Sequence, residues 1–457
     1  MSPWIGINCG GVFDKWYDTF DSHVTNLKVF MKSTESSPAQ PAGAVQPSVR
    51  SNRPSVQQTF AALKYRNYRL WFIGQVVSLF GTWMQVTAQG FLIFQLTQSP
   101  AYLGYVGFAA GVPAWLFTLY GGVIADRMPR RTLMLITQTA MMILAFVLAG
   151  LVFADLVQPW QIVTLAFLLG IANAFDGPAR LAFVVELVER EDLTNAIALN
   201  ATMFNLATAT GPAMAGLVYV LVGPAWCFML NGLSFIAAIV ALVRMNLPPP
   251  KPATKRASTW DDLSEGVRYI VREPSIRTLI GLVGMTSMFA ISFATLFPAW
   301  AVDVLGGDAT TNGLLQSARG LGALLGALTL ASLGRARFKG KLLTLGTFAL
   351  PLLLLLFTFV RALPMALLVL IGTGMAVILI MNVANALVQG LVPDALRGRV
   401  MSVYSMTFFG CMPIGALWIG AAAEYAGAPT AMIISALISL AFGVLLFIFA
   451  PWVRRLE

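Results

Sequence analysis

The sequence predicts an all-α membrane protein with about 12 transmembrane helices, arranged as two pseudo-symmetric six-helix bundles. Three observations support this fold class. The 457 residues are 58% hydrophobic and only 11% charged, whereas roughly a quarter of the residues of a soluble domain are charged. About twelve apolar stretches are each long enough to cross the hydrocarbon core of a bilayer as a helix. Nearly all positive charge lies in alternate connections between these stretches.

The predicted spans form two sets of six, separated by a proline-rich linker. The first set lies near 70–96, 101–125, 132–154, 160–178, 196–222 and 224–243. The second set lies near 278–302, 311–334, 341–360, 364–389, 400–423 and 429–451. The chain therefore divides into a flexible tail (1–58), an N-terminal bundle (59–243), a linker (244–277), a C-terminal bundle (278–451) and a short tail (452–457).

The segments outside the spans are polar. "SSPAQPAGAVQPSVRSNRPS" is typical of a flexible tail, and the residues before it lack the basic start and apolar run of a signal peptide. In the linker, the prolines of "LPPPKPATKRAS" exclude a helix. The following "TWDDLSEGVRYIVREPS" predicts an amphipathic helix that lies on the membrane surface. Its apolar face consists of Trp260, Leu263, Val267, Ile270 and Val271.

The distribution of the basic residues predicts the topology. Of the 30 Lys and Arg residues, only Arg319 and Arg361 fall outside the tails and loops of one side. The positive-inside rule places that side in the cytoplasm, so we expect a multi-pass protein of the bacterial inner (plasma) membrane with both termini cytoplasmic. The net charge of +10 therefore reflects topology and does not indicate a nucleic-acid partner.

Several kinds of chemistry find no support in the sequence. The three cysteines Cys9, Cys227 and Cys411 are far apart, and His23 is the only histidine. This pattern supports neither a metal site nor a disulfide framework. No Walker-type phosphate-binding motif is present, which argues against direct use of ATP. We expect no cofactor and no enzymatic activity.

The two sets of spans show signs of an internal repeat. "ELVEREDLTNAIALN" from Glu186 matches "GLVPDALRGRVMSVY" from Gly390 at an offset of 204 residues. Several glycines recur between the halves: Gly211 with Gly415, Gly216 with Gly420, Gly104 with Gly313, and Gly111 with Gly320. Two related halves that tilt against each other are the simplest interpretation.

The stretch "GGVIADRMPRRT", residues 121–132, concentrates charge in a turn between two spans. Its order of residues resembles the G-x-[LI]-A-D-R-x-G-R-[KR] loop between the second and third helices of the major facilitator superfamily. The resemblance covers the chain from about residue 60. "FDGPAR", "ELVEREDLTNAIALN" and "LVPDALRGRVMSVYS" look most like the branch of bacterial drug-efflux proteins and exporters that includes the enterobactin exporter. This resemblance implies alternating access by two rocking halves.

The resemblance also implies a cytoplasmic latch. Asp126 would cap the N-terminus of the eleventh helix near Arg399, where the helix dipole favours an anion. Arg130 would pair with Asp176, and both contacts would form only when the inner side is closed. Pro129 stands where the family has glycine. The predicted latch residues are Gly122, Asp126, Arg127, Arg130, Arg131 and Asp176.

A polar stripe follows one face of the first span. It consists of Gln75, Ser78, Thr82, Gln85 and Gln89. Hydrocarbon would penalise this stripe, so it bonds to other helices or lines a translocation cavity. Further candidates for the cavity wall are the polar Asn382, Asn385 and Gln389 and the aromatic Trp83, Trp115, Phe108 and Phe289.

Three further features each allow two interpretations. Gly211, Pro212 and Gly216 resemble a motif of proton-coupled antiporters, but they also suit simple close packing of helices. Arg319 either reaches outward to Asp303 or Asp308, or binds an anionic substrate in the cavity. Asp176 either makes a structural pair with a neighbour such as Arg180 or carries protons.

From these observations we expect a secondary active transporter that exports a small amphipathic molecule, such as a siderophore or drug, in exchange for protons. Its partners would be the small-molecule substrate, a proton or another coupling ion and membrane lipid, and we expect a monomer. One alternative is an importer that uses the same cavity in the opposite direction. The other is a membrane sensor or interaction protein that transports nothing.

Overall fold

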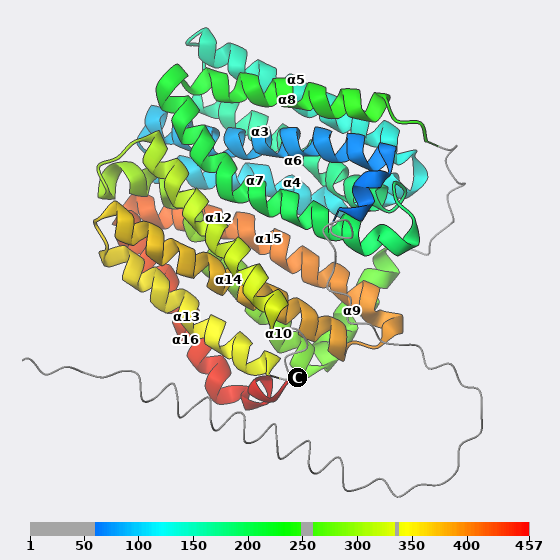
Figure 1. The fold of residues 1–457 in the computed structure, drawn as a ribbon. Helices are drawn as coiled ribbons and strands as arrows, with labels where there is room; N and C mark the ends of the chain where they lie inside the picture. Colours follow the sequence, from blue (N-terminus) through cyan, green and yellow to red (C-terminus); the bar gives the residue numbers. More distant parts are fainter. Residues whose placement is uncertain (1–59, 248–258, 334–337, 457) are drawn as a thin grey trace, which may run out of the picture. The chain divides into compact units, whose positions relative to one another are not determined.

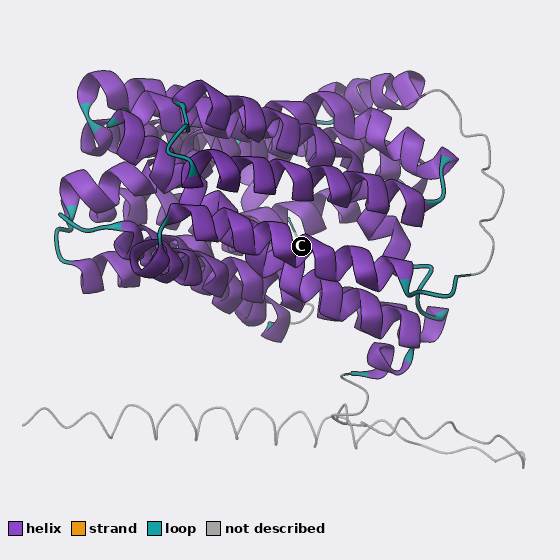
Figure 2. Ribbon diagram, turned by 90° about the horizontal axis from the view of Figure 1, so that it is seen from above, coloured by secondary structure: helices purple, strands orange, loops and turns teal. Residues whose placement is uncertain are grey.

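The computed structural model describes residues 60–247, 259–333 and 338–456; the predicted tail 1–58 and the segment Lys251–Arg256 lie outside them. Side chains of 118–119, 121–123, 125–127 and 259–262 are also outside the description. Residues Pro54–Glu457 belong to one compact unit. The described part of this unit is helical, without a strand (Figures 1 and 2).

The helices of the first half match the predicted spans in number and order. After a short 3-10 turn, η1 (Ala61–Lys64), they are α3 (Arg66–Thr97), α4 (Pro100–Arg127), α5 (Arg130–Phe153), α6 (Pro159–Val184), α7 (Leu193–Val222) and α8 (Pro224–Val243). Another 3-10 turn, η2 (Arg190–Asp192), precedes α7. Asp192 in η2 binds Lys64 Nζ at 2.6 Å, and this hydrogen bond raises the pKa of Lys64 above its ordinary value.

The second half begins with the amphipathic helix α9 (Thr259–Arg272). Its spans are an interrupted helix from α10 (Pro274–Met285) to η5 (Trp300–Val304), then α12 (Ala309–Ser332), α13 (Lys339–Phe359), α14 (Leu363–Leu391), α15 (Asp394–Ala426) and α16 (Ala428–Phe449). Eleven helical segments in the described residues are long and apolar enough to cross a membrane. α4, with 28 residues, is the remaining long helix of the described chain.

Proline and glycine set the boundaries between the spans. Pro100, Pro159 and Pro224 stand at the first position of α4, α6 and α8, where proline loses no helical hydrogen bond. Gly223 and Gly427 separate α7 from α8 and α15 from α16 with φ of +97° and +81°, a conformation that only glycine adopts without strain. These two glycines are 204 residues apart, as in the predicted repeat.

The seventh span differs from the predicted continuous helix. It contains a π-helical segment at Thr286–Ile291, a 3-10 segment at Ser292–Leu296 and a second π-helical segment at Trp300–Val304. Pro298 lacks an N–H for the regular ladder, and the Ser292 hydroxyl donates to Met288 O. The interrupted backbone is tolerated because this span is buried by its neighbours.

The helices of the bundle run between two ends (Figure 1). At one end, α9 packs on the start of α15: Glu265 and Arg399 form an ion pair of 2.6 Å, and Gly266 contacts the backbone of Arg399. We call this end the α9 end. The other end, where α15 finishes, is called the Glu424 end.

Candidate functional site

The first contact between the halves joins α4 to α15. A methyl group on Gly104 would lie 2.8 Å from Ala416 O, and one on Gly420 would lie 2.8 Å from Gly104 Cα. Gly111 lies against the ring of Pro413 in the same way. The absence of side chains at these glycines allows the two backbones to approach closely.

The second contact joins α7 to α12 and repeats the first. A methyl group on Gly216 would lie 2.6 Å from Ala309 O, and one on Gly320 would lie 2.6 Å from Thr208 O. Gly313 lies directly against the carbonyl oxygen of Pro212. The glycines that recur in the sequence therefore fill equivalent places in two equivalent helix contacts.

Both contacts end before the helices reach the α9 end. On α15 the contact stripe is buried at Gly420, Ala416, Pro413 and Gly410, the last of which lies against Trp115 of α4, but Ser402, nearer the α9 end, is exposed. The stripe on α7 is likewise buried at Gly216 and Pro212 and exposed at Ala201 and Ala198, and α12 exposes Leu328. The halves are thus in contact toward the Glu424 end and separated toward the α9 end.

A carboxylate from α15 secures the Glu424 end. Glu424 Oε2 accepts hydrogen bonds from Ser99 Oγ at 2.6 Å and from the N–H of Ala101 at 3.2 Å. Ser99 and Ala101 form the N-terminus of α4, which has no acidic residue in its first turn. The carboxylate of one half therefore caps a helix of the other, where the helix dipole favours an anion. No pattern in the sequence predicts this contact.

The predicted latch lies partly outside the description. The backbone of α4 continues to Arg127, but Gly122 and the side chains of Asp126 and Arg127 are among the residues whose surroundings are not described. Arg131 Nη2 donates to Val243 O at 2.8 Å, which ties α5 to the end of α8. The capping of α15 by Asp126 stays a prediction.

The predicted pair of Arg130 and Asp176 is absent from this state; it is expected only when the inner side is closed and stays a prediction. Arg130 Nη1 instead contacts Glu186 Oε1 at 2.8 Å and the carbonyl of Ala182 at 3.0 Å. The predicted span ends near residue 178, whereas α6 continues to Val184. Asp176 consequently lies about 12 Å inside the helix, away from its end.

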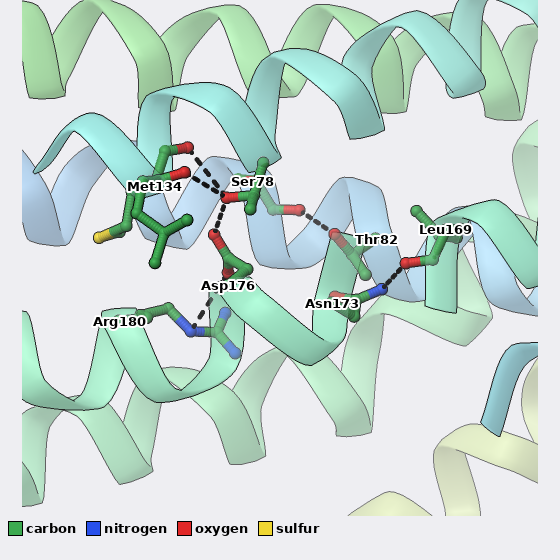
Figure 3. Close-up of polar contacts among 9 residues, drawn as sticks. Ser78, Thr82, Met134, Leu169, Asn173, Asp176 and Arg180 are labelled. Carbon is green, nitrogen blue, oxygen red and sulfur yellow. Dashed lines mark hydrogen bonds and ion pairs between the residues drawn. The ribbon is translucent and has the colours of Figure 1, made fainter. Parts of the chain in front are cut away.

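Asp176 instead takes part in a buried network between α5 and α6 (Figure 3). Its side chain accepts a hydrogen bond of 2.9 Å from Thr137 Oγ1 and lies 3.9 Å from Arg180 Nε. Asp176 is 3% exposed and is the only buried acidic residue in the described chain. The structural pairing with Arg180 is therefore present, while proton carrying is untested.

Thr137→Val is expected to reduce the stability of the protein by about 1.5 kcal/mol, because it removes the hydroxyl that donates a hydrogen bond to the buried carboxylate. Valine keeps the shape of threonine. The measurement is thermal unfolding of the purified protein in detergent. Thr164→Val is the matched control, since the Thr164 hydroxyl is exposed and bonds only to Trp160 O of its own helix. An equal change in both variants would contradict the role of Thr137.

The polar stripe of α3 is mostly buried between helices and does not form the wall of an open cavity. Gln75, Gln85 and Gln89 are 2–5% exposed. Gln85 Oε1 accepts from Asn231 Nδ2 of α8 at 2.6 Å, and Gln89 Nε2 donates to Ile162 O of α6 at 3.4 Å. The structure thus favours interhelical hydrogen bonding. Thr82, which donates to Ser78 O, is half-buried.

The polar candidates on α14, Asn382, Asn385 and Gln389, are more exposed than the buried stripe of α3. Asn382 and Gln389 are exposed, and Gln389 Nε2 donates to Asn385 Oδ1 at 2.5 Å. Of the aromatic candidates, Trp83 packs edge-on against Phe204, Phe289 packs edge-on against Trp418, and Trp115, 40% exposed, covers Gly410. Phe108 is half-buried.

Within the predicted motif, Pro212 and Gly216 belong to the contact between the halves, whereas Gly211 packs against α3 of its own half. A methyl group on Gly211 would lie 2.8 Å from Trp83 Cβ of α3. Pro212 breaks the regular ladder of α7, and the next N–H, that of Ala213, donates to Ser317 Oγ of α12 at 2.9 Å. Close packing is therefore observed, and a hinge role is compatible with it.

Arg319 lies near the middle of α12 without a charged partner in the described chain. Asp308, one of its two predicted partners, accepts the N–H of Thr311 and caps the same helix. Asp308 is also about 16 Å from Arg319 along the helix axis, farther than an arginine side chain extends. The predicted ion pair is therefore not formed.

Comparison with known proteins agrees with this architecture. The family model described as "Transmembrane secretion effector" matches residues 57–454. The multidrug efflux pump Tap of Mycolicibacterium fortuitum is 26% identical over 82% of this chain and 94% of its own. The enterobactin exporter EntS of Shigella boydii is 27% identical over 77% of this chain and 84% of its own. The solved structure of the nucleoside transporter NupG has a TM-score of 0.66 at 16% identity, covering 85% of this chain and 99% of that one.

Proposed function

Because the chain belongs to the transmembrane secretion effector family of the major facilitator superfamily, we propose that it exports small amphipathic molecules in exchange for protons. Family membership and the two exporter relatives identify a transporter, which excludes the alternative of a sensor that moves nothing. We place it in the bacterial inner membrane as a monomer with the α9 end in the cytoplasm. The concentration of basic residues at that end supports this orientation.

The observation that carries the mechanism is the one-sided contact between the halves. The α4–α15 and α7–α12 contacts are closed toward the Glu424 end and separated toward the α9 end. Two related halves in this arrangement correspond to one of the two states of alternating access, with the site open to the cytoplasm. Rocking about the glycine contacts would produce the other state.

Transport in everted membrane vesicles tests the proposal. When proton pumping acidifies the interior of everted vesicles, an exporter coupled to protons should accumulate substrate inside them. We suggest a panel of siderophores, dyes and antibiotics as substrates. Proton-driven release from preloaded vesicles would instead indicate an importer, and flux that ignores the pH difference would overturn the proton coupling.

Asp126→Asn is expected to slow transport by up to about fivefold if Asp126 caps α15 in the outward-open state. The substitution removes the charge that the helix N-terminus favours, worth up to about 1 kcal/mol at an exposed site. The rate should be measured in proteoliposomes with an imposed pH difference. Glu191→Gln, which neutralises an exposed acid in η2, is the control. A wild-type rate for Asp126→Asn would show that the latch role is wrong.

A further inference from the structure

One face of α12 carries two polar donor atoms without partners. Asn312 Nδ2 and Arg319 Nε are both buried, and neither has a hydrogen-bond acceptor in the described chain. Asn312 itself is fully buried. The two residues are seven positions apart, which places them on the same side of the helix, about 10 Å from each other along its axis. Orphaned donors at such depth are costly unless something supplies acceptors.

This face of α12 is directed at the other half of the protein. Gln316, which lies between the two donors, accepts a hydrogen bond of 3.3 Å from Thr87 Oγ1 of α3. Its amide also donates to Asn312 Oδ1 at 3.3 Å. On the flanks of the helix, Gly320 packs against α7 and the carbonyl of Arg319 packs against Gly374 of α14. The face that carries Asn312, Gln316 and Arg319 therefore points toward the centre of the bundle.

The charge of Arg319 has no counter-ion within this region. The only buried acidic side chain of the described residues, Asp176, is on α6 and is already bonded to Thr137 and paired with Arg180. A cation in the membrane interior is expensive when unpaired, and such residues usually mark a functional pathway. The guanidinium group offers several donors in a planar fork that fits two oxygen acceptors at once.

We propose that this face of α12 binds an anionic substrate, with Arg319 holding a carboxylate or deprotonated phenol and Asn312 donating to a second oxygen of the same molecule. The inference rests on the proposed transport function and specifies the substrate class. Because both orphaned atoms are donors, a cationic solute would satisfy neither of them and would face Arg319 as a like charge. The site thus selects for negative charge and for acceptors spread over about 10 Å.

Two dyes built on the same ring system test the inference: carboxyfluorescein, which is anionic, and rhodamine 123, which is cationic. Their binding to the purified full-length protein in detergent can be followed by fluorescence anisotropy. The wild type should bind carboxyfluorescein more tightly than rhodamine 123. Arg319→Gln should weaken carboxyfluorescein binding about tenfold or more and leave rhodamine 123 binding unchanged, while Arg319→Lys should restore part of the affinity because it keeps the charge but not the fork.

Arg361→Gln is the matched control, because Arg361 is exposed between α13 and α14 and bonds only to the nearby carbonyls of Thr358 and Val360. Equal binding of carboxyfluorescein by the wild type and Arg319→Gln would overturn the proposal, as would failure of the wild type to bind it. Thermal unfolding of each variant identifies a protein that has not folded, in which case Arg319→Lys decides alone. Binding is measured without a gradient, so intact binding without flux would contradict the proposed transport and leave the anion site standing.

Discussion

Gly313→Val is expected to reduce transport about tenfold or more by preventing the halves from closing at the Glu424 end. The Cβ of any larger residue at this position would overlap the carbonyl oxygen of Pro212 in the other half. This obstacle is backbone, so no change of rotamer can remove it. Overpacking of this kind costs about 1–3 kcal/mol, and each 1.4 kcal/mol changes a population ratio about tenfold.

The substitution should affect the balance between states more than the fold, because Gly313 meets the opposite half. Spin labels on Leu221 and Thr430, both exposed at the Glu424 end in different halves, should show a longer distance in Gly313→Val. Gly150→Val is the control, since nothing lies within 4 Å of a methyl group there. A wild-type distance distribution together with wild-type transport would show that the α7–α12 contact does not have to be tight.

The sequence was sufficient to predict the helices and the repeat. Hydrocarbon admits only helices or closed barrels, so long apolar stretches determine the elements almost alone, and all 12 predicted spans have a counterpart in the described residues. The recurrent glycines were also informative, because close approach of two backbones leaves room for no other residue. Gly104 and Gly313 indeed fill equivalent places.

The site was harder to predict, and for physical reasons. Polar residues at helical spacing show that one face of a helix avoids lipid, but they do not show whether that face contacts protein or water. Gln85, for example, contacts protein, because its side chain accepts a hydrogen bond from Asn231. Hydropathy also places the end of a helix poorly, so Asp176, expected at the end of the fourth span, lies inside α6, which continues to Val184. The interrupted seventh span and the contact between Ser99 and Glu424 depend on tertiary packing, which a single sequence does not reveal.

Glu424→Gln is expected to shift the protein toward the state that is open at the Glu424 end. Glutamine keeps the size of the side chain and one acceptor oxygen but loses the charge that the N-terminus of α4 favours. The dipole interaction and the charge-assisted hydrogen bond to Ser99 together contribute about 1–2 kcal/mol. The ratio of the two states should therefore change by about 5- to 30-fold, which the spin labels on Leu221 and Thr430 would record as a larger population at long distance.

Asp155→Asn provides the matched control, because it removes the same charge at the same end from a loop residue outside the contact. Asn tolerates the positive φ of 54° at this position. A double-mutant cycle with Ser99→Ala then isolates the contact itself, since Glu424→Gln weakens the same hydrogen bond that Ser99→Ala removes, and the two effects should not be additive. If Glu424 and Ser99 hold the halves together, adding Ser99→Ala to Glu424→Gln should change the distances little. Additive effects of Glu424→Gln and Ser99→Ala would contradict the proposed contact, as would equal effects of Glu424→Gln and Asp155→Asn. Either result would mean that the charge of Glu424 acts only through the summed electrostatic field at this end of the protein. The capping of α4 would then have no part in alternating access.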